Sequence, residues 1–396
     1  MKYKDDKARF SLLEVIIITL VASLIMSLST GYVVFRSKKI YNVSNSKYIE
    51  EFAKSYNNIV NNYYDEIDEN SLIDAAINGM LEYLQDPYTT YLNENNTILL
   101  TDSLKGTYEG IGVEVATEEN GIIIKNVFDE SPASKAGLLK GDIISKIDGN
   151  DLTDKNASEA VALIKANDTN NIQIEINRNG ETKSFNLYKS SLYIPAIYKE
   201  IFNQNNHKIG YLQISRFSDS IYEQFNKELR NLEDSYIDSL IIDLRNNTGG
   251  YLIGATNIAE LFLEKGKIIY SLQNKISKND TKDSTDEHRK YKVYVLINKG
   301  TASASEVLAA ALKYSYGATL VGDTSYGKGK VQKTSNLTDG TMYKYTSAKW
   351  LTPNGECIDN IGLNPDIKVE ISEKYIEEPI FENDNQIQTA IFEISK

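Results

Sequence analysis

The chain has 396 residues, 41% of them hydrophobic and 25% charged, which is enough for two or three globular domains with sizeable cores. Its formal net charge of -12 argues against nucleic acid as the main partner, because phosphate binding requires a basic face. A single cysteine excludes a disulfide bond within the chain.

An uncharged segment near the N-terminus predicts a membrane anchor. The segment Val15–Phe35 has 21 residues, and a helix needs about 20 apolar residues to cross the hydrocarbon layer. Basic residues flank it on both sides, so the positive-inside rule does not fix its orientation. The alternative, a cleaved signal peptide, has a shorter apolar region and an A-x-A-like cleavage site, and no good site of that kind is evident here. Residues 1–40 are therefore predicted to be a cytoplasmic stub and a single-pass transmembrane helix.

Residues 41–100 form a polar region that is predicted to be helical. Apolar and aromatic side chains recur three or four residues apart, which places them on one helix face: Ile49, Phe52, Tyr56, Ile59 and Tyr63. A second helical pattern covers residues 71–86. These helices offer a surface for a homodimer, although the sequence leaves the oligomeric state open.

Short predicted strands and glycine turns occupy residues 104–190. The region resembles a PDZ domain of the circularly permuted bacterial kind, an α+β fold, through "GIGV" (Gly110–Val113), "SPASKAGLLKGDII" (131–144) and "IDG" (147–149). The backbone N–H groups of the first motif would converge on the carboxylate of a C-terminal tail, and the peptide would add as a strand at the sheet edge. The predicted peptide-binding residues are Gly110, Ile111, Gly112 and Val113.

Strand-like and helical runs alternate between residues 191 and 370, which predicts an α/β domain. Strands are expected at 209–217, 239–247, 292–298 and 318–323, and helices at 221–234, 253–264 and 304–316. The polar stretch 273–291 is predicted to be a mobile surface loop. A short acidic tail, residues 371–396, follows the domain, and no function is assigned to it.

Three hydroxyl residues, Thr301, Ser303 and Ser305, stand at alternate positions just before a helix-forming run. Ser303 and Glu306 fit the capping-box pattern, so Ser303 is expected at the start of a helix. It would serve there as a cap alone, or also as a nucleophile, because amides at a helix start can stabilise an oxyanion.

A serine nucleophile needs a base, and the chain has two histidines. His207 and His288 both lie in polar, loop-like surroundings, so a Ser-His-Asp triad is poorly supported. Lys328 stands between two glycines after a predicted buried strand, whereas Lys330 is expected to point elsewhere. At an ordinary pKa of about 10.4, only about one lysine in 2,500 is neutral at pH 7. Lys328 is therefore expected to be buried, with few acidic groups near it.

The stretch "GTASASEVLAAAL" followed by "GDTSYGKGKVQ" resembles the serine–lysine site of the C-terminal processing peptidases, also called tail-specific proteases. The resemblance implies that Ser303 is the nucleophile and that Lys328, 25 residues later, is the base. It also implies that Gln332 orients the lysine. The likeness extends over about residues 45–370.

The motif "DLRNNTGGYL" resembles the glycine pair whose backbone contributes to the oxyanion hole of this family. This likeness implies an oxyanion hole built from Gly249 or Gly250 together with the amide of Ala304. Thr248 replaces a proline that is common in the family, and Thr301 replaces a serine or glycine. Neither residue is expected to touch a reacting group.

The resemblance implies an α/β multidomain protein with a catalytic domain of the ClpP/crotonase-like type at residues 191–370. It implies a membrane-anchored serine endopeptidase that needs no metal or cofactor and acts on proteins with exposed C-terminal tails. It further implies an extracytoplasmic catalytic domain, a PDZ domain that gates the site through Arg178, and a regulatory partner. The alternative is a membrane-tethered PDZ adaptor that binds protein tails without cutting them, which would leave Lys328 and Gln332 unexplained.

Overall fold

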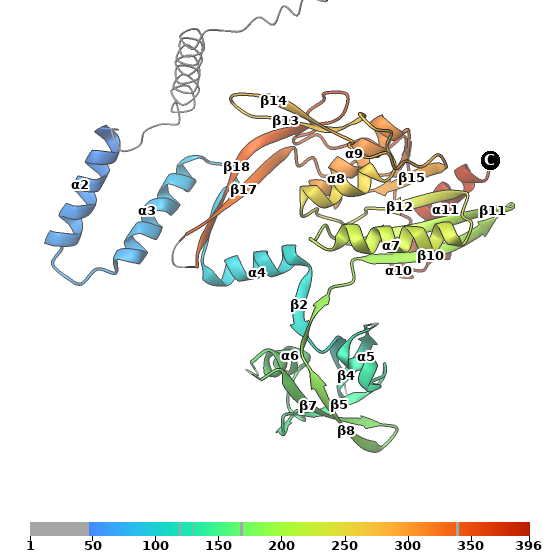
Figure 1. Cartoon of the computed structure of the whole chain (residues 1–396), viewed down its shortest axis with the longest axis horizontal. Coiled ribbons are helices and arrows are strands. Elements are labelled where there is room, and N and C mark those ends of the chain that lie inside the picture. The colour runs from blue at the N-terminus through green and yellow to red at the C-terminus, as the bar shows by residue number, and fades with distance from the viewer. Residues whose placement is uncertain (1–46, 119, 129, 167–168, 338–339) are drawn as a thin grey trace, which may run out of the picture. The chain divides into compact units, whose positions relative to one another are not determined.

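The computed structural model describes residues 47–118, 120–128, 130–166, 169–337 and 340–396 (Figure 1). The predicted transmembrane segment Val15–Phe35 lies outside these residues. Within the described part of the chain, no helix is both long enough and apolar enough to cross a membrane. The chain divides into two compact units, residues 1–77 and 78–396.

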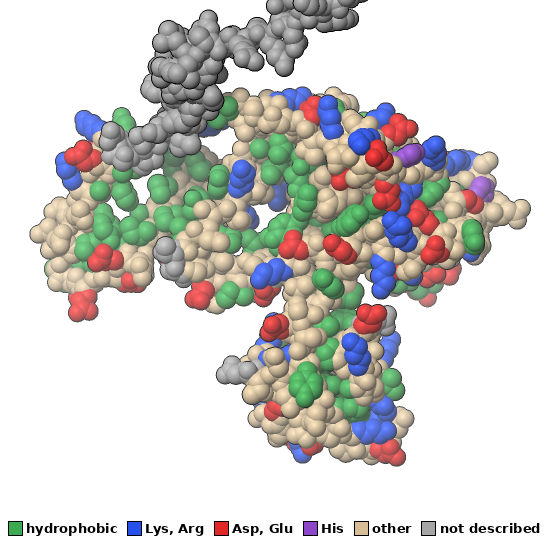
Figure 2. All heavy atoms as spheres, in the orientation of Figure 1, with side chains coloured by type: hydrophobic (Ala, Val, Ile, Leu, Met, Phe, Trp, Pro, Cys, Tyr) green, Lys and Arg blue, Asp and Glu red, His purple; other side chains and the backbone are tan. Residues whose placement is uncertain are grey.

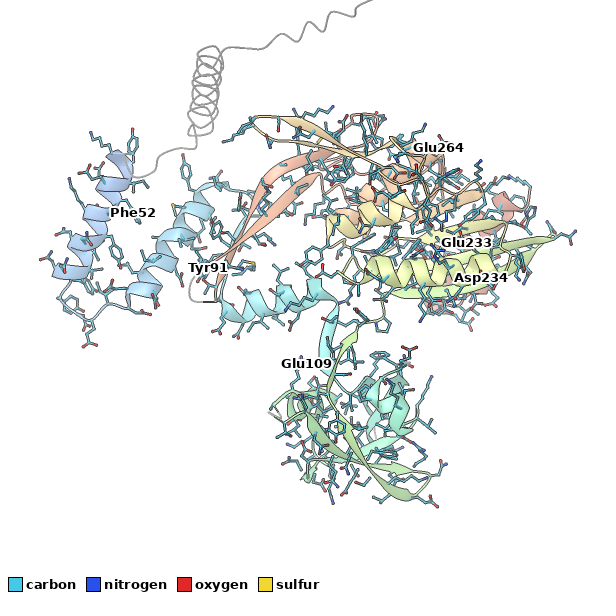
Figure 3. All side chains as sticks on the ribbon, in the orientation of Figure 1. Phe52, Tyr91, Glu109, Glu233, Asp234 and Glu264 are labelled. Carbon is cyan, nitrogen blue, oxygen red and sulfur yellow. The ribbon has the colours of Figure 1, made fainter. Side chains whose placement is uncertain are left out.

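The described part of the first unit runs from α2 (Lys47–Asn62) into α3 (Glu69–Tyr83). The hydroxyl of Tyr56 donates a hydrogen bond of 2.7 Å to the Glu69 carboxylate, which joins the two helices. The predicted helical period of α2 is confirmed, but none of its residues, all of them described, is buried. Its apolar face is exposed (Figures 2 and 3): Ile49 45%, Phe52 47% and Ile59 46%. Tyr63, which follows the helix, is 55% exposed.

An antiparallel sheet is built around the long strand β18. Its members are β1 (Thr90–Leu92), β13 (Ile268–Gln273), β14 (Lys278–Lys282), β17 (Lys330–Asn336) and β18 (Met342–Leu351), and α4 (Glu94–Lys105) follows β1. The prediction of a mobile loop over residues 273–291 is wrong for β14, which pairs with β13. Backbone hydrogen bonds make this strand, and its sequence "KNDTK" carries no apolar signal from which a strand could be predicted.

The PDZ-like region forms a second antiparallel sheet in the order β3-β4-β5-β7-β8. Its elements are β3 (Val113–Glu118), β4 (Gly121–Val127), α5 (Pro132–Ala136), β5 (Ile143–Ile147), β6 (Asn150–Asp151), α6 (Ala157–Ala166), β7 (Asn171–Arg178) and β8 (Glu181–Tyr188). The strands that lead in and out, β2 (Thr107–Gly110) and β9 (Ser190–Tyr193), pair with each other. Strand β3 pairs only with β4 among the described strands, so it is a sheet edge.

The α/β domain contains a six-stranded sheet in the order β10-β11-β12-β15-β16-β19. The strands are β10 (Ile197–Gln204), β11 (His207–Ile214), β12 (Ser239–Asp243), β15 (Lys292–Ile297), β16 (Thr319–Gly322) and β19 (Ile367–Lys368). The helices α7 (Ile221–Asp234), α8 (Leu252–Glu260) and α9 (Ala304–Ala311) connect them, and a π-helical turn, Leu312–Tyr316, follows α9. The predicted strand–helix alternation is confirmed, and all strand pairs from β11 to β19 are parallel.

Both faces of this sheet are buried, as the apolar run of β12 shows. Leu240 and Ile242 pack in the cluster that contains α7, α8 and α9. Ile241, between them, packs on the other face with Ile387 and Ile391 of α11 (Asn385–Ile394). Successive residues of a strand point to opposite faces, so a continuous apolar strand requires cover on both sides. The residues after 370 form α10 (Glu373–Glu377), the 3-10 turn Phe381–Asn383 and α11 (Figure 1). Of these elements, the 3-10 turn and α11 supply the second cover.

A buried ion network fastens these last residues to the sheet. The Arg245 guanidinium donates to Asp243 at 2.6 Å and to Asp384 at 2.8 Å, and also to the side-chain oxygen of Gln386 at 2.9 Å. Both carboxylates are 0% exposed, and Asp243 also accepts from the Tyr211 hydroxyl at 2.8 Å. Burial acts against the charged guanidinium, but the two carboxylates hold the pKa of Arg245 above its ordinary value. Arg245 is therefore the charged counter-ion of both carboxylates at neutral pH.

Arg245→Met is expected to destabilise the protein by about 3–5 kcal/mol, because two buried carboxylates lose their counter-ion. Arg230→Met is the matched control, since the Arg230 side chain is 58% exposed and its ion pair with Glu287 is long, at 3.4 Å. The control is expected to change the free energy of unfolding by less than about 1 kcal/mol. Urea unfolding of both variants measures the difference, and equal losses would contradict the structural role of the network.

Candidate active site

The loops that follow β12, β15 and β16 meet at the carboxyl edge of the parallel sheet. Hydrogen bonds join the loop after β15 to the loop after β12 and, through Glu306, to the loop after β16. Ligands of open α/β sheets bind outside the carboxyl ends of the strands. The predicted site residues therefore lie where such a fold places its chemistry.

The three alternating hydroxyl residues have different surroundings. Thr301 and Ser305 are both 0% exposed. Thr301 donates to the carbonyl of Leu244 at 2.8 Å, and Ser305 donates to the carbonyl of Asn247 at 2.9 Å. Ser303 is only partly buried. Two of the hydroxyls thus fasten the loop, and Ser303 is the one of the three that can meet a substrate.

Ser303 has an unusual backbone conformation, with φ 58° and ψ −119°. A non-glycine residue in such a region costs on the order of 1–3 kcal/mol, and such strain clusters at functional sites. The predicted helix start is confirmed, because α9 begins at Ala304 with Ser303 as its N-cap. The capping-box partners are both in place, and Glu306 accepts the Ser303 N–H at 2.8 Å. Capping and an accessible hydroxyl therefore coexist at Ser303.

The carboxylate of Glu306 joins Ser303 to Lys328. One oxygen, Oε2, accepts the backbone N–H of Ser303 at 2.8 Å and that of Lys328 at 2.9 Å. The other oxygen, Oε1, accepts the Gly327 N–H at 2.7 Å and the Ser325 hydroxyl at 2.5 Å. The backbone nitrogens of Ser303 and Lys328 consequently lie within two hydrogen-bond lengths of each other.

Sequence reasoning identified Glu306 only as a capping residue. Its side chain is 0% exposed, and burial raises the pKa of the Glu306 carboxyl although four donors act in the opposite direction. The Ser-x-x-Glu spacing signalled its bond to Ser303. The second bond, to a loop 22 residues away, has no local sequence signal.

Lys328 is half-buried, and burial lowers the pKa of its amine. The positive charge of Lys344 lowers this pKa further, whereas Glu306 raises it. Lys328 forms no ion pair within the described residues, but Glu306 is an acid closer than the sequence suggested. The Nζ of Lys328 lies 5.0 Å from the centroid of the Tyr88 ring, and the Nζ of Lys330 lies 5.5 Å from the same centroid. Lys330 was expected to point elsewhere, yet it shares this ring.

Gln332 lies on β17, beside a register shift in the pairing of β17 with β18. Its side-chain amide donates to the Thr346 hydroxyl at 3.3 Å, which ties it across the strand pair. The role expected for Gln332, orienting Lys328, stays a prediction.

Gly249 and Gly250 pack closely against their surroundings. A Cβ atom on Gly249 would lie 2.9 Å from the Cβ of Ser303 and 3.0 Å from the backbone nitrogen of Ala304. A Cβ atom on Gly250 would lie 2.0 Å from the carbonyl oxygen of Phe217. Both glycines have positive φ, 98° and 142°. Only glycine allows this loop to approach Ser303 so closely.

The backbone N–H groups distinguish the two glycines. The Gly249 N–H donates to the Asn247 side chain at 2.9 Å, so it is already engaged. The two neighbours of Gly250 form hydrogen bonds with Phe217: the Gly249 carbonyl accepts the Phe217 N–H, and the Tyr251 N–H donates to the Phe217 carbonyl. The N–H of Gly250 itself therefore points away from Phe217. Ala304 occupies the first position of α9, where backbone amides have no partner within the helix. Of the expected donors, Gly250 and Ala304 are thus the ones whose N–H groups are better placed, and the oxyanion hole itself stays a prediction.

The motif Gly110–Val113 leads from β2 into the edge strand β3. The carbonyl of Ile111 accepts the Ala133 N–H at 2.9 Å, and the carbonyl of Gly112 accepts the Phe128 N–H at 2.9 Å. In a trans peptide the N–H group points away from the carbonyl that precedes it. The N–H groups of Gly112 and Val113 therefore point away from Ala133 and Phe128. This orientation suits the predicted capture of a carboxylate.

Arg178 is engaged inside the PDZ-like region. Its guanidinium forms two hydrogen bonds with the buried Asp142 carboxylate, at 2.6 and 2.7 Å, and a third with the Gly137 carbonyl at 2.8 Å. Burial opposes the charged carboxylate, but Arg178 helps to hold the pKa of Asp142 below its ordinary value. The gating role of Arg178 stays a prediction.

Each of the two histidines has an aspartate as its neighbour. His207 contacts Asp238 at 3.3 Å, and His288 is exposed, near the Asp286 carbonyl. Among the residues that the structure describes, no group of three or more His, Cys, Asp and Glu side chains is arranged to hold a metal ion.

Comparisons with known proteins give the family. The peptidase family S41 model matches residues 208–369, a PDZ domain model matches residues 110–188, and a model described as the activating protease CtpB N-terminal domain matches residues 29–96. The chain is 38% identical over 327 residues to the carboxy-terminal processing protease CtpB of Bacillus subtilis (strain 168), which covers 82% of this chain and 68% of that relative. This chain belongs to peptidase family S41. As a member of that family it is a serine-type peptidase with a PDZ domain, and the resemblance seen in the sequence is confirmed.

Other S41 relatives agree. The carboxy-terminal processing protease CtpA of Bacillus subtilis (strain 168) is 33% identical over 387 residues, covering 97% of this chain and 82% of that relative. Among solved structures, the photosystem II D1 C-terminal processing protease aligns with a TM-score of 0.50 and 23% identity, covering 83% of this chain and 88% of that one. At this identity the structural match shows the shared fold.

Ser303→Ala is expected to lower kcat/KM by more than about 10³-fold while leaving the fold intact. Ser305→Ala, the matched control, removes a fully buried hydrogen bond and should cost about 1–3 kcal/mol of stability, with a far smaller loss of activity than Ser303→Ala. Proteolysis assays and thermal unfolding of both variants separate the two effects. Full activity in Ser303→Ala would reject this residue as the nucleophile.

Gly249→Ala is expected to lower kcat by about 10²-fold, because the new methyl group displaces Ser303 or Ala304 from its position. Gly266→Ala is the control, since Gly266 also has a positive φ, 87°, with no neighbouring atom within 4 Å of the place that the added methyl group would occupy. Both variants carry similar backbone strain, so a loss of activity confined to Gly249→Ala identifies the contact as its cause. Equal losses would identify strain alone.

Proposed function

We propose that this S41 peptidase is a membrane-anchored serine endopeptidase in which Ser303 is the nucleophile and Lys328 the general base. The observation that carries the proposal is the Glu306 carboxylate, which binds the backbone amides of both residues through one oxygen. This shared acceptor holds the backbones of the two residues close together, which supports a dyad between their side chains. A general base must be able to exist without its proton, and the lowered pKa of Lys328 makes the neutral amine more accessible.

In the first half of the reaction, the neutral amine of Lys328 accepts the proton of the Ser303 hydroxyl as Oγ attacks the peptide carbonyl carbon. The N–H groups of Gly250 and Ala304 donate to the oxygen that becomes negatively charged. Lys328 then gives its proton to the departing amine, and an acyl ester on Ser303 remains. In the second half, Lys328 takes a proton from the water molecule that attacks the ester, and returns it to the Oγ of Ser303 as the new C-terminus is released.

Gln332 would hold the Lys328 side chain in the direction of Ser303. Its amide already has one partner on β18, the Thr346 hydroxyl, which limits the orientations that it can adopt. No metal or cofactor takes part in these steps.

The PDZ-like domain would select substrates with exposed C-terminal tails. Strand β3 is a sheet edge, and the amides of Gly110–Val113 precede it. A tail peptide would extend the sheet along β3, with its carboxylate at these amides. Selection of tails in this way accords with the names of the carboxy-terminal processing relatives.

The segment Val15–Phe35 would anchor the enzyme in the cell membrane as a single-pass helix, with the catalytic domain on the extracytoplasmic side. Its length and lack of charge support the anchor. The exposed apolar face of α2 would suit a homodimer, and a regulatory partner would act through the PDZ-like domain and Arg178.

The test is cleavage of an unfolded protein such as casein by the full chain in detergent between about pH 6 and pH 10. Because the pKa of Lys328 is lowered, the neutral base forms at a lower pH than for an ordinary lysine. Activity should therefore rise with pH and level off below the ordinary lysine pKa of about 10.4. Lys328→Ala is expected to lose more than about 10³-fold of kcat/KM.

Lys299→Ala is the control for this experiment, because the Lys299 side chain is 85% exposed. It should cleave casein as the unmodified chain does. If Lys328→Ala kept a substantial part of the activity, Lys328 would not be the base, and His207 or His288 would have to supply it.

A further inference from the structure

Residues 86–92, which precede the PDZ-like region in the sequence, lie next to Lys328. Strand β1 pairs with β18, with Thr90 opposite Lys344, and Figure 3 shows Tyr91 beside β17 and β18. The residues just before this strand, 86–89, contact the beginning of β17 through Lys330. The S41 family model begins only at residue 208, so this segment lies outside the region that defines the peptidase.

Tyr88 in this segment lies against the lysine of the proposed dyad. The centroid of its ring is 5.0 Å from the Nζ of Lys328 and 5.5 Å from the Nζ of Lys330. Both distances fall within the range of about 6 Å for an ammonium that interacts with an aromatic face. Tyr88 is itself partly buried, and burial raises the pKa of its phenol.

Several polar contacts hold the segment in place. Asp86 accepts hydrogen bonds from the Thr89 hydroxyl at 2.7 Å and from Lys330 at 3.3 Å. The Thr89 hydroxyl in turn accepts the backbone N–H of Thr346 at 3.1 Å. Thr346 is also the partner of Gln332. The segment thus engages the same strand pair that carries the residue expected to orient Lys328.

The charges around Lys328 come from several elements. Glu306 lies on α9, Lys344 on β18 and Lys330 on β17, while Tyr326 and Asp359 lie on loops near Tyr88. Asp86 pairs with Lys330 and so offsets one of the two neighbouring cations.

We propose that Tyr88 is a positioning residue of the active site, whose ring covers the Lys328 amine and holds it out of water. This inference rests on the proposed role of Lys328 as the base. It makes the docking of residues 86–92 on β18 a condition for a competent base, although these residues lie outside the S41 region.

Two physical effects of the ring oppose each other. The π face attracts the ammonium form by about 0.5–1 kcal/mol at an exposed site. Exclusion of water favours the neutral form, and burial is the largest influence on the Lys328 pKa. Under this proposal shielding is the stronger of the two effects, so removal of the ring is expected to make the base harder to deprotonate.

The experiment measures kcat/KM for casein against pH in Tyr88→Ala, Tyr88→Phe and Tyr88→Leu, each made in the full chain. In Tyr88→Ala the midpoint of the rise with pH is expected to move up by about 0.5–1 unit, which lowers activity about three- to tenfold at pH 7 and restores it at high pH. Tyr88→Phe keeps the ring and is expected to keep the wild-type midpoint. Tyr326→Phe removes a neighbouring hydroxyl without touching the Tyr88 ring, and Tyr83→Ala removes a tyrosine that is 86% exposed; both controls are expected to keep the wild-type midpoint.

A uniform loss at every pH in Tyr88→Ala would indicate a purely structural residue and overturn the proposal, as would an unchanged profile. Tyr88→Leu covers the case in which the alanine variant does not fold. It keeps an apolar cover without the π face, so its midpoint is expected to stay at or below that of wild type, and an upward shift would overturn shielding as the cause. Lys328→Ala distinguishes a failure of the proposed base from a failure of the Tyr88 inference. If that variant is active, Lys328 is not the base. If it is inactive, the pH profiles of the Tyr88 variants test the role of Tyr88 alone.

Discussion

A buried carboxylate that receives four hydrogen bonds determines how this active site is built. A charge without solvent is costly unless it is fully hydrogen-bonded, and Glu306 obtains its donors from three backbone amides and one hydroxyl. Those donors belong to the start of α9 and to the loop after β16. The carboxylate therefore makes one rigid body of two loops that are separate in the sequence, and the proposed nucleophile and base belong to that body.

The surrounding residues maintain a local conformation that Ser303 would not adopt by itself. Thr301 and Ser305 fasten the chain on either side of it to the loop after β12. Gly249 approaches Ser303 from that same loop, and only the missing side chain makes this approach feasible. The strain at Ser303 is thus supported by contacts on three sides, which is how a serine can cap a helix and still present its hydroxyl.

The strands and helices of the α/β domain were predictable because each carries a strong local pattern. The apolar run of β12 and the helical spacing of α7 depend on nothing distant in the sequence. The roles of Ser303 and Lys328 come from the resemblance of their loops to a known motif, and they stay predictions. Strand β14, the second bond of Glu306 and the position of Tyr88 were not predictable, since each depends on a partner that only the fold brings close. The same holds for the bond from the Gly249 N–H to Asn247, which favours Gly250 as the proposed oxyanion donor.

The ion network at Arg245 imposes an order on biosynthesis. Asp384 follows Arg245 by 139 residues, so a ribosome must complete most of the catalytic domain before the arginine can meet its second carboxylate. Asn247, which holds the Gly249 amide, lies two residues after Arg245. Until residue 384 emerges, a guanidinium at the base of the loop that holds Gly249 lacks one of its two carboxylates. A nascent chain can therefore complete this network only near the end of its synthesis.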